Sequence, residues 1–367
     1  MRDGHAQDGV LTLPSRPSAL SARAINRRTV LGAAASFLGS GFPSLASPDA
    51  VPGSVWESAD PRTAGWSSAR LQAAQDEAAR LGTTAVVVAR HGRLVAGWGD
   101  VTRKVDVASV RKSLLGALIG IAVAEGRLSL DSTLADLGID DLPPALTPEE
   151  RRARLRDLLM ARSGIYHPAA HETAPMKRDR PARGSHPPGS FRFYNNWDFN
   201  ALGTIYRRAT GEDLFAAFER RIAGPIGMQD FTAADGRYVR EKASEHPAYP
   251  FRLTARDAAR FGQLYLDRGM WGGRQIVPAD WVAASTTAWS PTDRGHQGYG
   301  YLWWVPNPDV FGPGAAYAAG YGGQMIAIVP ARGLVMAVTT DWRQGGHTVR
   351  GSELVGLLMR VVEASPP

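Results

Sequence analysis

The sequence of 367 residues contains no cysteine. This absence excludes disulfide bonds, thiolate metal ligands and a cysteine nucleophile, although it leaves the cellular compartment open. A Gly-x-Ser-x-Gly elbow is also missing, which disfavours an α/β-hydrolase. No glycine-rich phosphate-binding pattern occurs at a strand-to-helix turn, so the sequence does not imply a nucleotide.

Charge of one sign is only mildly in excess. The 42 lysines and arginines against 35 acidic residues give a formal charge of +7, and the basic residues are scattered along the chain. This pattern gives no reason to expect nucleic-acid binding. With 44% hydrophobic and 21% charged residues, the composition is that of one large domain or two closely packed ones.

A paired arginine marks the N-terminal region. Arg27 and Arg28 precede a short apolar stretch, residues 32–38, and a small-x-small site follows at residues 44–46. This order is typical of a twin-arginine export signal over residues 1–46, and the apolar core is too short for a permanent membrane span. We therefore expect export by the twin-arginine machinery to the periplasm or the medium. The alternative is a disordered arm with a chance arginine pair.

Hydrophobic patterning beyond the signal changes along the chain from strands to helices and back to strands. A linker is predicted over residues 47–62, and a hairpin over residues 83–98 turns at His91-Gly92. A helix over residues 67–81 is predicted before this hairpin. The middle of the chain reads as helices over 148–160, 198–210 and 213–222, with a long loop over 163–190. A strand over 299–305, a second hairpin over 325–340 and a helix over 352–363 follow.

This order predicts an α+β fold whose antiparallel sheet is built from both ends of the chain and flanked by helices. The sheet domain comprises residues 63–108 and 296–367. A mostly helical domain is inserted over residues 109–295.

Ser109 and Lys112 lie three positions apart at the head of an apolar run that reads as a helix. Residues i and i+3 share a helix face, so the two side chains can touch. A serine hydroxyl needs a neighbouring base to become a nucleophile, and a buried lysine can serve because desolvation lowers its pKa. The motif alone is short, and a serine N-cap followed by a solvated lysine is the competing interpretation.

Two further segments carry candidate chemistry. Tyr194 and Asn196 lie in a loop before a predicted helix, and a tyrosine hydroxyl beside a lysine can relay a proton. Gly320 and Tyr321 directly precede the strand predicted from residue 325. A glycine lets a strand edge approach a ligand, and a backbone N–H there can face a developing oxyanion. An aromatic surface anchor and a flexible turn are the plainer interpretations of these segments.

The order of Ser-x-x-Lys, Tyr-x-Asn and a glycine-containing strand resembles the serine hydrolases related to class C β-lactamases and DD-peptidases, a family that includes esterases and an aminohexanoate-oligomer hydrolase. The similarity covers roughly residues 55–360. The resemblance implies that Ser109 is acylated, that Lys112 assists its deprotonation and that Tyr194 passes the proton to the leaving group. It further implies substrate or oxyanion contacts from Asn196, Gly320 and Tyr321.

One departure from the family pattern bears on the substrate. Its β-lactamases and DD-peptidases carry Lys-Thr-Gly or His-Thr-Gly as the third motif, whereas the matching triplet here is Ala318-Ala319-Gly320, or Gly320-Tyr321-Gly322 in the other register. Losing a charged contact to a substrate carboxylate costs about 1.5–3 kcal/mol. We therefore expect an acyl-enzyme hydrolase of a small ester or amide. The alternatives are a β-lactamase or DD-peptidase, and an inactive binding protein of the same fold.

Neither a metal nor another cofactor is expected. His167 and His171 have the spacing of a helical two-histidine metal site, but Pro168 between them would break a helix there. A pair of loop histidines is the preferred interpretation.

Overall fold

The computed structural model describes residues 51–292, 298–345 and 347–367. The predicted export signal, residues 1–46, lies outside these ranges. Within them, no helix has the length and apolar character needed to cross a membrane.

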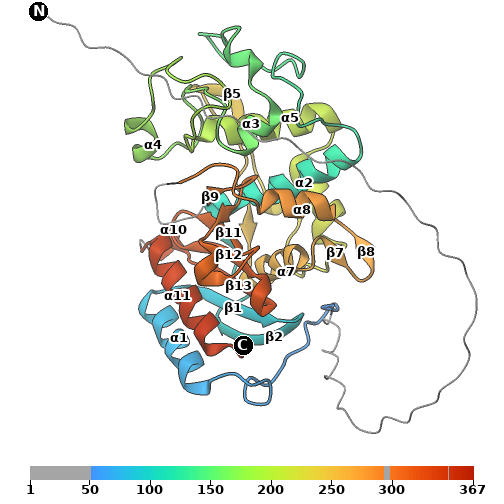
Figure 1. Cartoon of the computed structure of the whole chain (residues 1–367), viewed down its shortest axis with the longest axis vertical. Coiled ribbons are helices and arrows are strands. Elements are labelled where there is room, and N and C mark those ends of the chain that lie inside the picture. The colour runs from blue at the N-terminus through green and yellow to red at the C-terminus, as the bar shows by residue number, and fades with distance from the viewer. Residues whose placement is uncertain (1–50, 293–297, 346) are drawn as a thin grey trace, which may run out of the picture. The chain divides into compact units, whose positions relative to one another are not determined.

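A seven-stranded antiparallel sheet forms the centre of the fold (Figure 1), and its strand order is β2-β1-β13-β12-β11-β10-β9. The first hairpin of the chain therefore pairs with the last, with Ala85 opposite Thr339. This confirms the predicted α+β fold with a sheet built from both chain ends. The strands are β1 (Ala85–Arg90), β2 (Arg93–Gly99), β9 (Gly298–Tyr299), β10 (Trp304–Val305), β11 (Ala316–Gly320), β12 (Gln324–Val329) and β13 (Leu334–Thr339).

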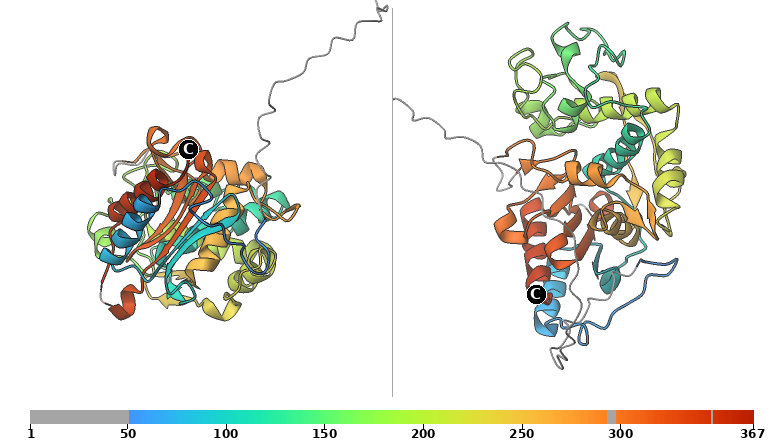
Figure 2. Two further views of the ribbon diagram at one scale, coloured as in Figure 1. Left: turned by 90° about the horizontal axis from the view of Figure 1, so that it is seen from below. Right: turned by 45° about the vertical axis from the view of Figure 1, so that its right-hand side comes forward.

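Both faces of the sheet are covered, which explains why β12 and β13 are buried along their whole length. Alternate side chains of a strand point to opposite faces, so Val86 and Val88 belong to one core cluster and Val87 to the other. Helices α1 (Ser68–Arg80) and α11 (Gly351–Ala364) cover the first face, and α7 (Ala255–Leu266) covers the second (Figure 2).

The middle of the chain is mostly helical, as predicted, but α7 packs on the sheet although it lies within the segment assigned to the inserted domain. The division into two domains stays a prediction. The helices of this segment are α2 (Arg111–Ala124), α3 (Leu155–Leu159), α4 (Ala174–Arg178), α5 (Asn196–Thr210), α6 (Leu214–Phe218) and α8 (Ala279–Ser285).

Short elements connect these helices to the sheet. Three small ladders pair β3 (Val105–Asp106) with β6 (Arg252–Leu253), β4 (Val239–Glu241) with β5 (Ser244–Ala248), and β7 (Met270–Trp271) with β8 (Arg274–Gln275). Helices α9 (Pro308–Phe311) and α10 (Trp342–Gly345) flank the last strands.

Two predicted elements are interrupted by long-range contacts. The helix expected over 148–160 breaks at Ala153, which has an extended backbone and accepts a hydrogen bond from the N–H of Leu134. The strand expected over 299–305 breaks at Leu302, whose φ of +65° places it in the left-handed region. Its N–H donates to Leu159 and its carbonyl accepts from the Ser113 hydroxyl. Distant partners therefore override the local preference at both positions.

The segment predicted as a linker is packed against the folded body where it is described. Trp56 is buried and donates from its indole nitrogen to the carbonyl of Gly92 at 2.8 Å. Ser58 forms a bridge with Leu94 on β2. Burial of a tryptophan stabilises the docked segment. The linker over residues 47–62 stays a prediction.

Candidate active site

Ser109 lies in a tight turn between β3 and α2. Residues Ala108–Val110 form a single 3-10 turn, and Ala108 has a left-handed φ of +47°. The backbone N–H of Ala108 donates to Asp106 at 2.9 Å, and Arg343 pairs with the same carboxylate at 2.8 Å. Asp106 therefore fixes the turn, and a strained backbone at Ala108 is held in place by side-chain bonds.

Lys112 reaches back from the first turn of α2 to the serine. Its Nζ lies 2.6 Å from Ser109 Oγ, and the lysine is only 2% exposed. Burial, and secondarily the charge of Arg111, hold the pKa of Lys112 well below its ordinary value. The lowered pKa favours the neutral amine, which can accept the proton of a serine hydroxyl.

Aromatic rings surround the lysine amine. The rings of Tyr194 and Phe199 lie 5.2 Å and 4.9 Å from Lys112 Nζ. Tyr194 itself stacks on Trp304 of β10, with 5.6 Å between the ring centroids, and packs edge-on to Tyr299 at 5.9 Å. The tyrosine is thus held between the helix that carries Lys112 and the edge of the sheet.

Buried bonds keep α2 in position behind the site. The hydroxyl of Ser113 donates to the carbonyl of Leu302 at 2.7 Å. Arg111 donates to the side-chain oxygen of Asn200 on α5 at 3.1 Å, and its guanidinium lies 4.0 Å from the ring centre of Tyr249. These contacts tie the serine–lysine helix to three separate parts of the chain.

The end of β11 lies against the turn that carries Ser109. A Cβ at Gly320 would lie 2.4 Å from the carbonyl oxygen of Val107, so only glycine fits there without a shift. The next residue, Tyr321, is 57% exposed, and its ring meets the edge of Trp342 at 5.1 Å. Gly320 therefore allows the end of β11 to approach the turn that carries Ser109.

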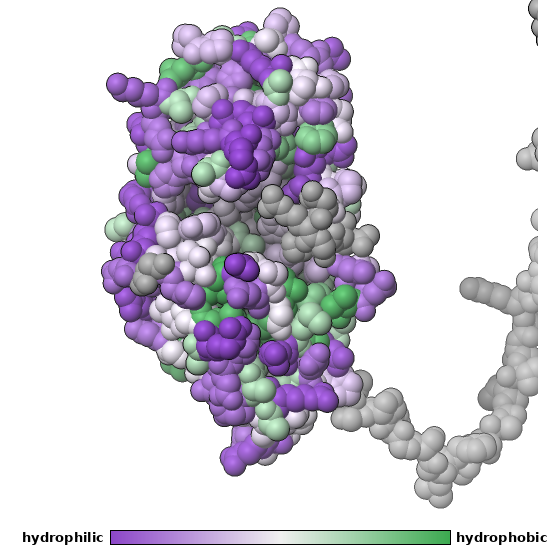
Figure 3. Space-filling view, turned by 90° about the vertical axis from the view of Figure 1, so that its left-hand side faces the viewer, coloured by the Kyte–Doolittle hydropathy of each residue, from purple (hydrophilic) through white to green (hydrophobic). Residues whose placement is uncertain are grey.

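Ser109, Tyr194, Gly320 and Tyr321 line one open pocket of about 1440 Å³. On the face shown in Figure 3, hydrophobic residues gather beside a hollow near the middle of the molecule. Lys112 lies behind the serine, buried in the wall. The structure therefore brings five of the six predicted site residues to one place.

Asn196 is the exception. It is buried at the start of α5, its side-chain nitrogen donates to the carbonyl of His171, and it does not line the pocket. No hydrogen bond joins it to Lys112 among the contacts of the described residues. Its neighbour Asn195 caps α5 by accepting from the N–H of Asp198. The role suggested for Asn196 by resemblance stays a prediction.

Sequence reasoning missed Phe199 and the two arginines that line the pocket. Phe199 packs on the lysine amine one turn into α5, and a periodic reading of the aromatic cluster around Tyr194 could have found it. Arg162 and Arg192 line the pocket. No local sequence pattern identifies either arginine as a site residue.

His167 and His171 have different surroundings, and the backbone carbonyl of His171 accepts from the side chain of Asn196. His167 is buried, with its ring nitrogens 3.7 Å from Asp141 and 3.6 Å from Glu150. Among the described residues there is no group of three histidine or acidic side chains arranged to hold a metal ion.

The structure has an antiparallel sheet that is covered by helices on both faces. A serine and a lysine are paired at the head of a buried helix beside it. These features together are typical of one class of hydrolase. The chain matches the family model described as Beta-lactamase over residues 68–357. Since this match spans most of the sequence, the protein belongs to the β-lactamase family, and it is a hydrolase of that family.

Solved structures of other proteins share this fold. A protein of Bacillus anthracis described as a 6-aminohexanoate-dimer hydrolase is 22% identical, with a TM-score of 0.61 over 80% of this chain and 83% of its own. A penicillin-binding protein homologue from Caulobacter crescentus is 18% identical, with a TM-score of 0.60 over 84% and 98%. EstCE1, a hydrolase with promiscuous acyltransferase activity, is 16% identical, with a TM-score of 0.56 over 82% and 98%. At these identities the likeness concerns the fold.

Proposed function

We propose that the protein hydrolyses an ester or amide through an acyl-enzyme on Ser109. The observation that carries the proposal is the 2.6 Å contact between Ser109 Oγ and the buried Nζ of Lys112. A lysine used only for charge would sit in water or beside a carboxylate. This one is buried, and its amine contacts an alcohol that opens on a large pocket.

The proposed first step forms the bond between Ser109 Oγ and the substrate carbonyl carbon. The hydroxyl proton passes to Lys112, and the Tyr194 hydroxyl protonates the departing alcohol or amine as the acyl bond breaks. Lys112 then returns a proton to Tyr194. In the second step, water adds to the acyl carbon and releases the acid, and the serine regains its proton.

The developing oxyanion requires hydrogen-bond donors fixed near Ser109. We assign this role to the backbone N–H groups of Ser109 and Tyr321, because Gly320 holds the end of β11 against the serine's turn. Such preorganised donors are commonly worth about 3–4 kcal/mol in the transition state.

Covalent labelling tests the proposal. A fluorescent fluorophosphonate is expected to label the wild-type chain, with the adduct located at Ser109 by peptide mass spectrometry. Ser109→Ala should abolish labelling and ester hydrolysis, whereas Ser68→Ala, at an exposed serine on α1, should leave both unchanged. Full esterase activity in Ser109→Ala would refute the assignment.

Efficient β-lactam turnover is not expected. The last residues of β11, Ala318-Ala319-Gly320, offer neither a cation nor a hydroxyl to a substrate carboxylate. A nitrocefin assay is expected to show slow or no turnover compared with a chromogenic ester. Rapid nitrocefin hydrolysis that is lost in Ser109→Ala would reassign the protein as a β-lactamase with the same nucleophile.

Export by the twin-arginine route remains part of the proposal because Arg27 and Arg28 precede a short apolar stretch. Replacing both arginines by lysine should retain the chain in the cytoplasm of an expressing bacterium. Unchanged export of that double variant would remove this part of the account.

A further inference from the structure

The pocket that contains Ser109 is larger than a small ester requires. Its volume of about 1440 Å³ exceeds the range of about 300–1,000 Å³ that is usual for small-molecule pockets. The bond-breaking chemistry at the serine alone does not specify what occupies a pocket of this size.

Charged residues are confined to one wall of this pocket. Arg162, Asp179 and Arg192 are the charged side chains among the described residues that line it, and all three come from the segment 162–194. A second part of the lining comes from residues 304–359 and contributes no charged side chain. The two walls therefore present different chemistry to one bound molecule.

The uncharged wall forms an apolar lobe, which consists of Val310, Phe311, Tyr317, Val355 and Met359. Val310 is 50% exposed and Met359 is 41% exposed, although both are large hydrophobic residues. Of the nine exposed large hydrophobic residues in the described chain, four line this pocket, the other two being Phe191 and Tyr321. A concentration of exposed apolar surface in one concavity marks a binding region.

The apolar lobe is continuous with the nucleophile along β11. Gly320 lies against the turn of Ser109, and Tyr317 and Ala319 of the same strand line the pocket further away. Three strand residues span about 10 Å, so the lobe begins at the reacting centre and extends about that far from it. An occupant of the lobe can therefore be part of a molecule whose carbonyl carbon is at Ser109.

We infer that the substrate carries a long apolar group, of the kind found in a medium-chain acyl ester, which lies along β11 in the apolar lobe. This inference rests on the proposed function, because it treats the lobe as a part of the Ser109 site. The substrate class is then an ester or amide of a hydrophobic acid, with room for a polar or charged portion at the wall that holds Arg162.

A chain-length series of p-nitrophenyl esters, from acetate to octanoate, tests the inference in the full chain. Each methylene buried in the lobe is expected to raise kcat/KM by up to about fourfold, the equivalent of about 0.8 kcal/mol. Met359→Asp should lower the ratio of octanoate to acetate kcat/KM by at least about tenfold, and Val310→Asp should act in the same direction. Met270→Asp is the matched control, because Met270 is 37% exposed and does not line the pocket.

A binding measurement separates this inference from the proposed function. The fluorescence of N-phenyl-1-naphthylamine should rise with the wild-type protein, and 1-octanol should displace it. Met359→Asp should bind it weakly, with unchanged circular dichroism as the check on folding.

The outcomes separate the two proposals. If no ester is hydrolysed but the probe still binds and is displaced in this way, the proposed function is refuted and the apolar lobe is retained as a binding region. A flat chain-length profile in an active enzyme overturns the inference alone. Dimerisation that Met359→Asp abolishes, together with a flat profile, would assign the lobe to a second copy and also overturn it.

Discussion

Two lysines on one short stretch of chain have opposite surroundings. Lys104 donates to Asp235 at 2.6 Å in a partly exposed ion pair. Lys112 is buried, contacts the hydroxyl of Ser109 and forms no ion pair among the described residues. Burial without a carboxylate partner lowers the pKa of Lys112, so this amine gives up its proton readily.

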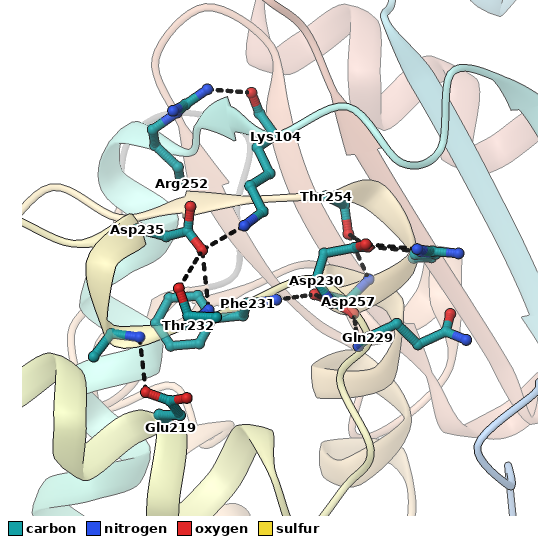
Figure 4. Close-up of polar contacts among 12 residues, drawn as sticks. Lys104, Glu219, Gln229, Asp230, Phe231, Thr232, Asp235, Arg252, Thr254 and Asp257 are labelled. Carbon is teal, nitrogen blue, oxygen red and sulfur yellow. Dashed lines mark hydrogen bonds and ion pairs between the residues drawn. The ribbon is translucent and has the colours of Figure 1, made fainter.

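The polar region around Lys104 shows what a structural use of charge looks like (Figure 4). Asp257, at the start of α7, accepts backbone N–H bonds from Gln229, Asp230 and Phe231 at 2.7–3.0 Å. Asp230 in turn accepts from Arg256, and this arginine lowers the pKa of that carboxyl. In this network Asp230, Asp235 and Asp257 each accept from several donors. The amine of Lys112, by contrast, has one hydrogen-bond partner, the Ser109 hydroxyl, beside two aromatic rings.

The largest expected effect separates the two lysines. Lys112→Ala should lower kcat/KM for a chromogenic ester by about 10²–10⁴-fold, because the serine loses its base. Lys104→Ala, the matched control, should leave kcat/KM nearly unchanged and lower the free energy of unfolding by about 1 kcal/mol, measured in urea. Equal losses of activity in the two variants would erase the distinction between the catalytic and the structural lysine.

A smaller effect is expected from the contact between β11 and the serine's turn. Gly320→Ala places a Cβ 2.4 Å from the Val107 carbonyl oxygen, so the turn or the strand must move. A displacement of about 1 Å can lower the rate by about 100-fold, and we expect a loss of that order in kcat. The control is Gly356→Ala on α11, where a Cβ meets no atom within 4 Å. Unchanged kcat in Gly320→Ala would show that this contact does not position the site.

Charge beside Lys112 should set the pH dependence of the reaction. The neutral amine is the active form, so activity falls as the pH drops below the pKa of Lys112. Arg111 lowers that pKa, and Arg111→Gln should raise it while keeping a donor for Asn200. The acidic limb of the kcat/KM profile is therefore expected to move to higher pH. A shift to lower pH, or no shift in a folded variant, would contradict the electrostatic argument.

The carboxyl group of Asp198 is buried, in contrast to the ion-paired carboxylates near Lys104. Burial raises the pKa of Asp198 to about 8, and its carboxyl accepts from the Ser163 hydroxyl. Between about pH 4 and pH 8 the unfolded chain ionises this group and the folded chain does not, so its contribution to stability falls as the pH rises. Asp198→Asn should flatten that decline in chemical unfolding experiments. An unaltered slope would mean that Asp198 is ionised in the folded protein.

Much of the fold could be predicted because the relevant signals are local. The two hairpins follow from apolar β-branched runs, and α1 lies within the helix predicted over residues 67–81. The breaks at Ala153 and Leu302 could not be predicted, because their causes are hydrogen bonds from residues far away in the sequence.

The candidate site divides in the same way. Helical spacing allows Ser109 and Lys112 to touch, and Lys112 Nζ lies 2.6 Å from Ser109 Oγ. The sequence marks Tyr194 and Gly320 as candidates, and only the folded chain shows that both line the serine's pocket. The apolar lobe combines side chains of β11, α9 and α11, whose juxtaposition no local pattern reveals.

The most direct measurement is the rate of Ser109 phosphonylation as a function of pH, followed by intact-protein mass spectrometry. We predict that the rate rises through a single ionisation well below the ordinary pKa of a lysine, and that this ionisation disappears with the reaction in Lys112→Ala. A rate that rises only near pH 10.4, or labelling that survives intact in Lys112→Ala, would contradict the account.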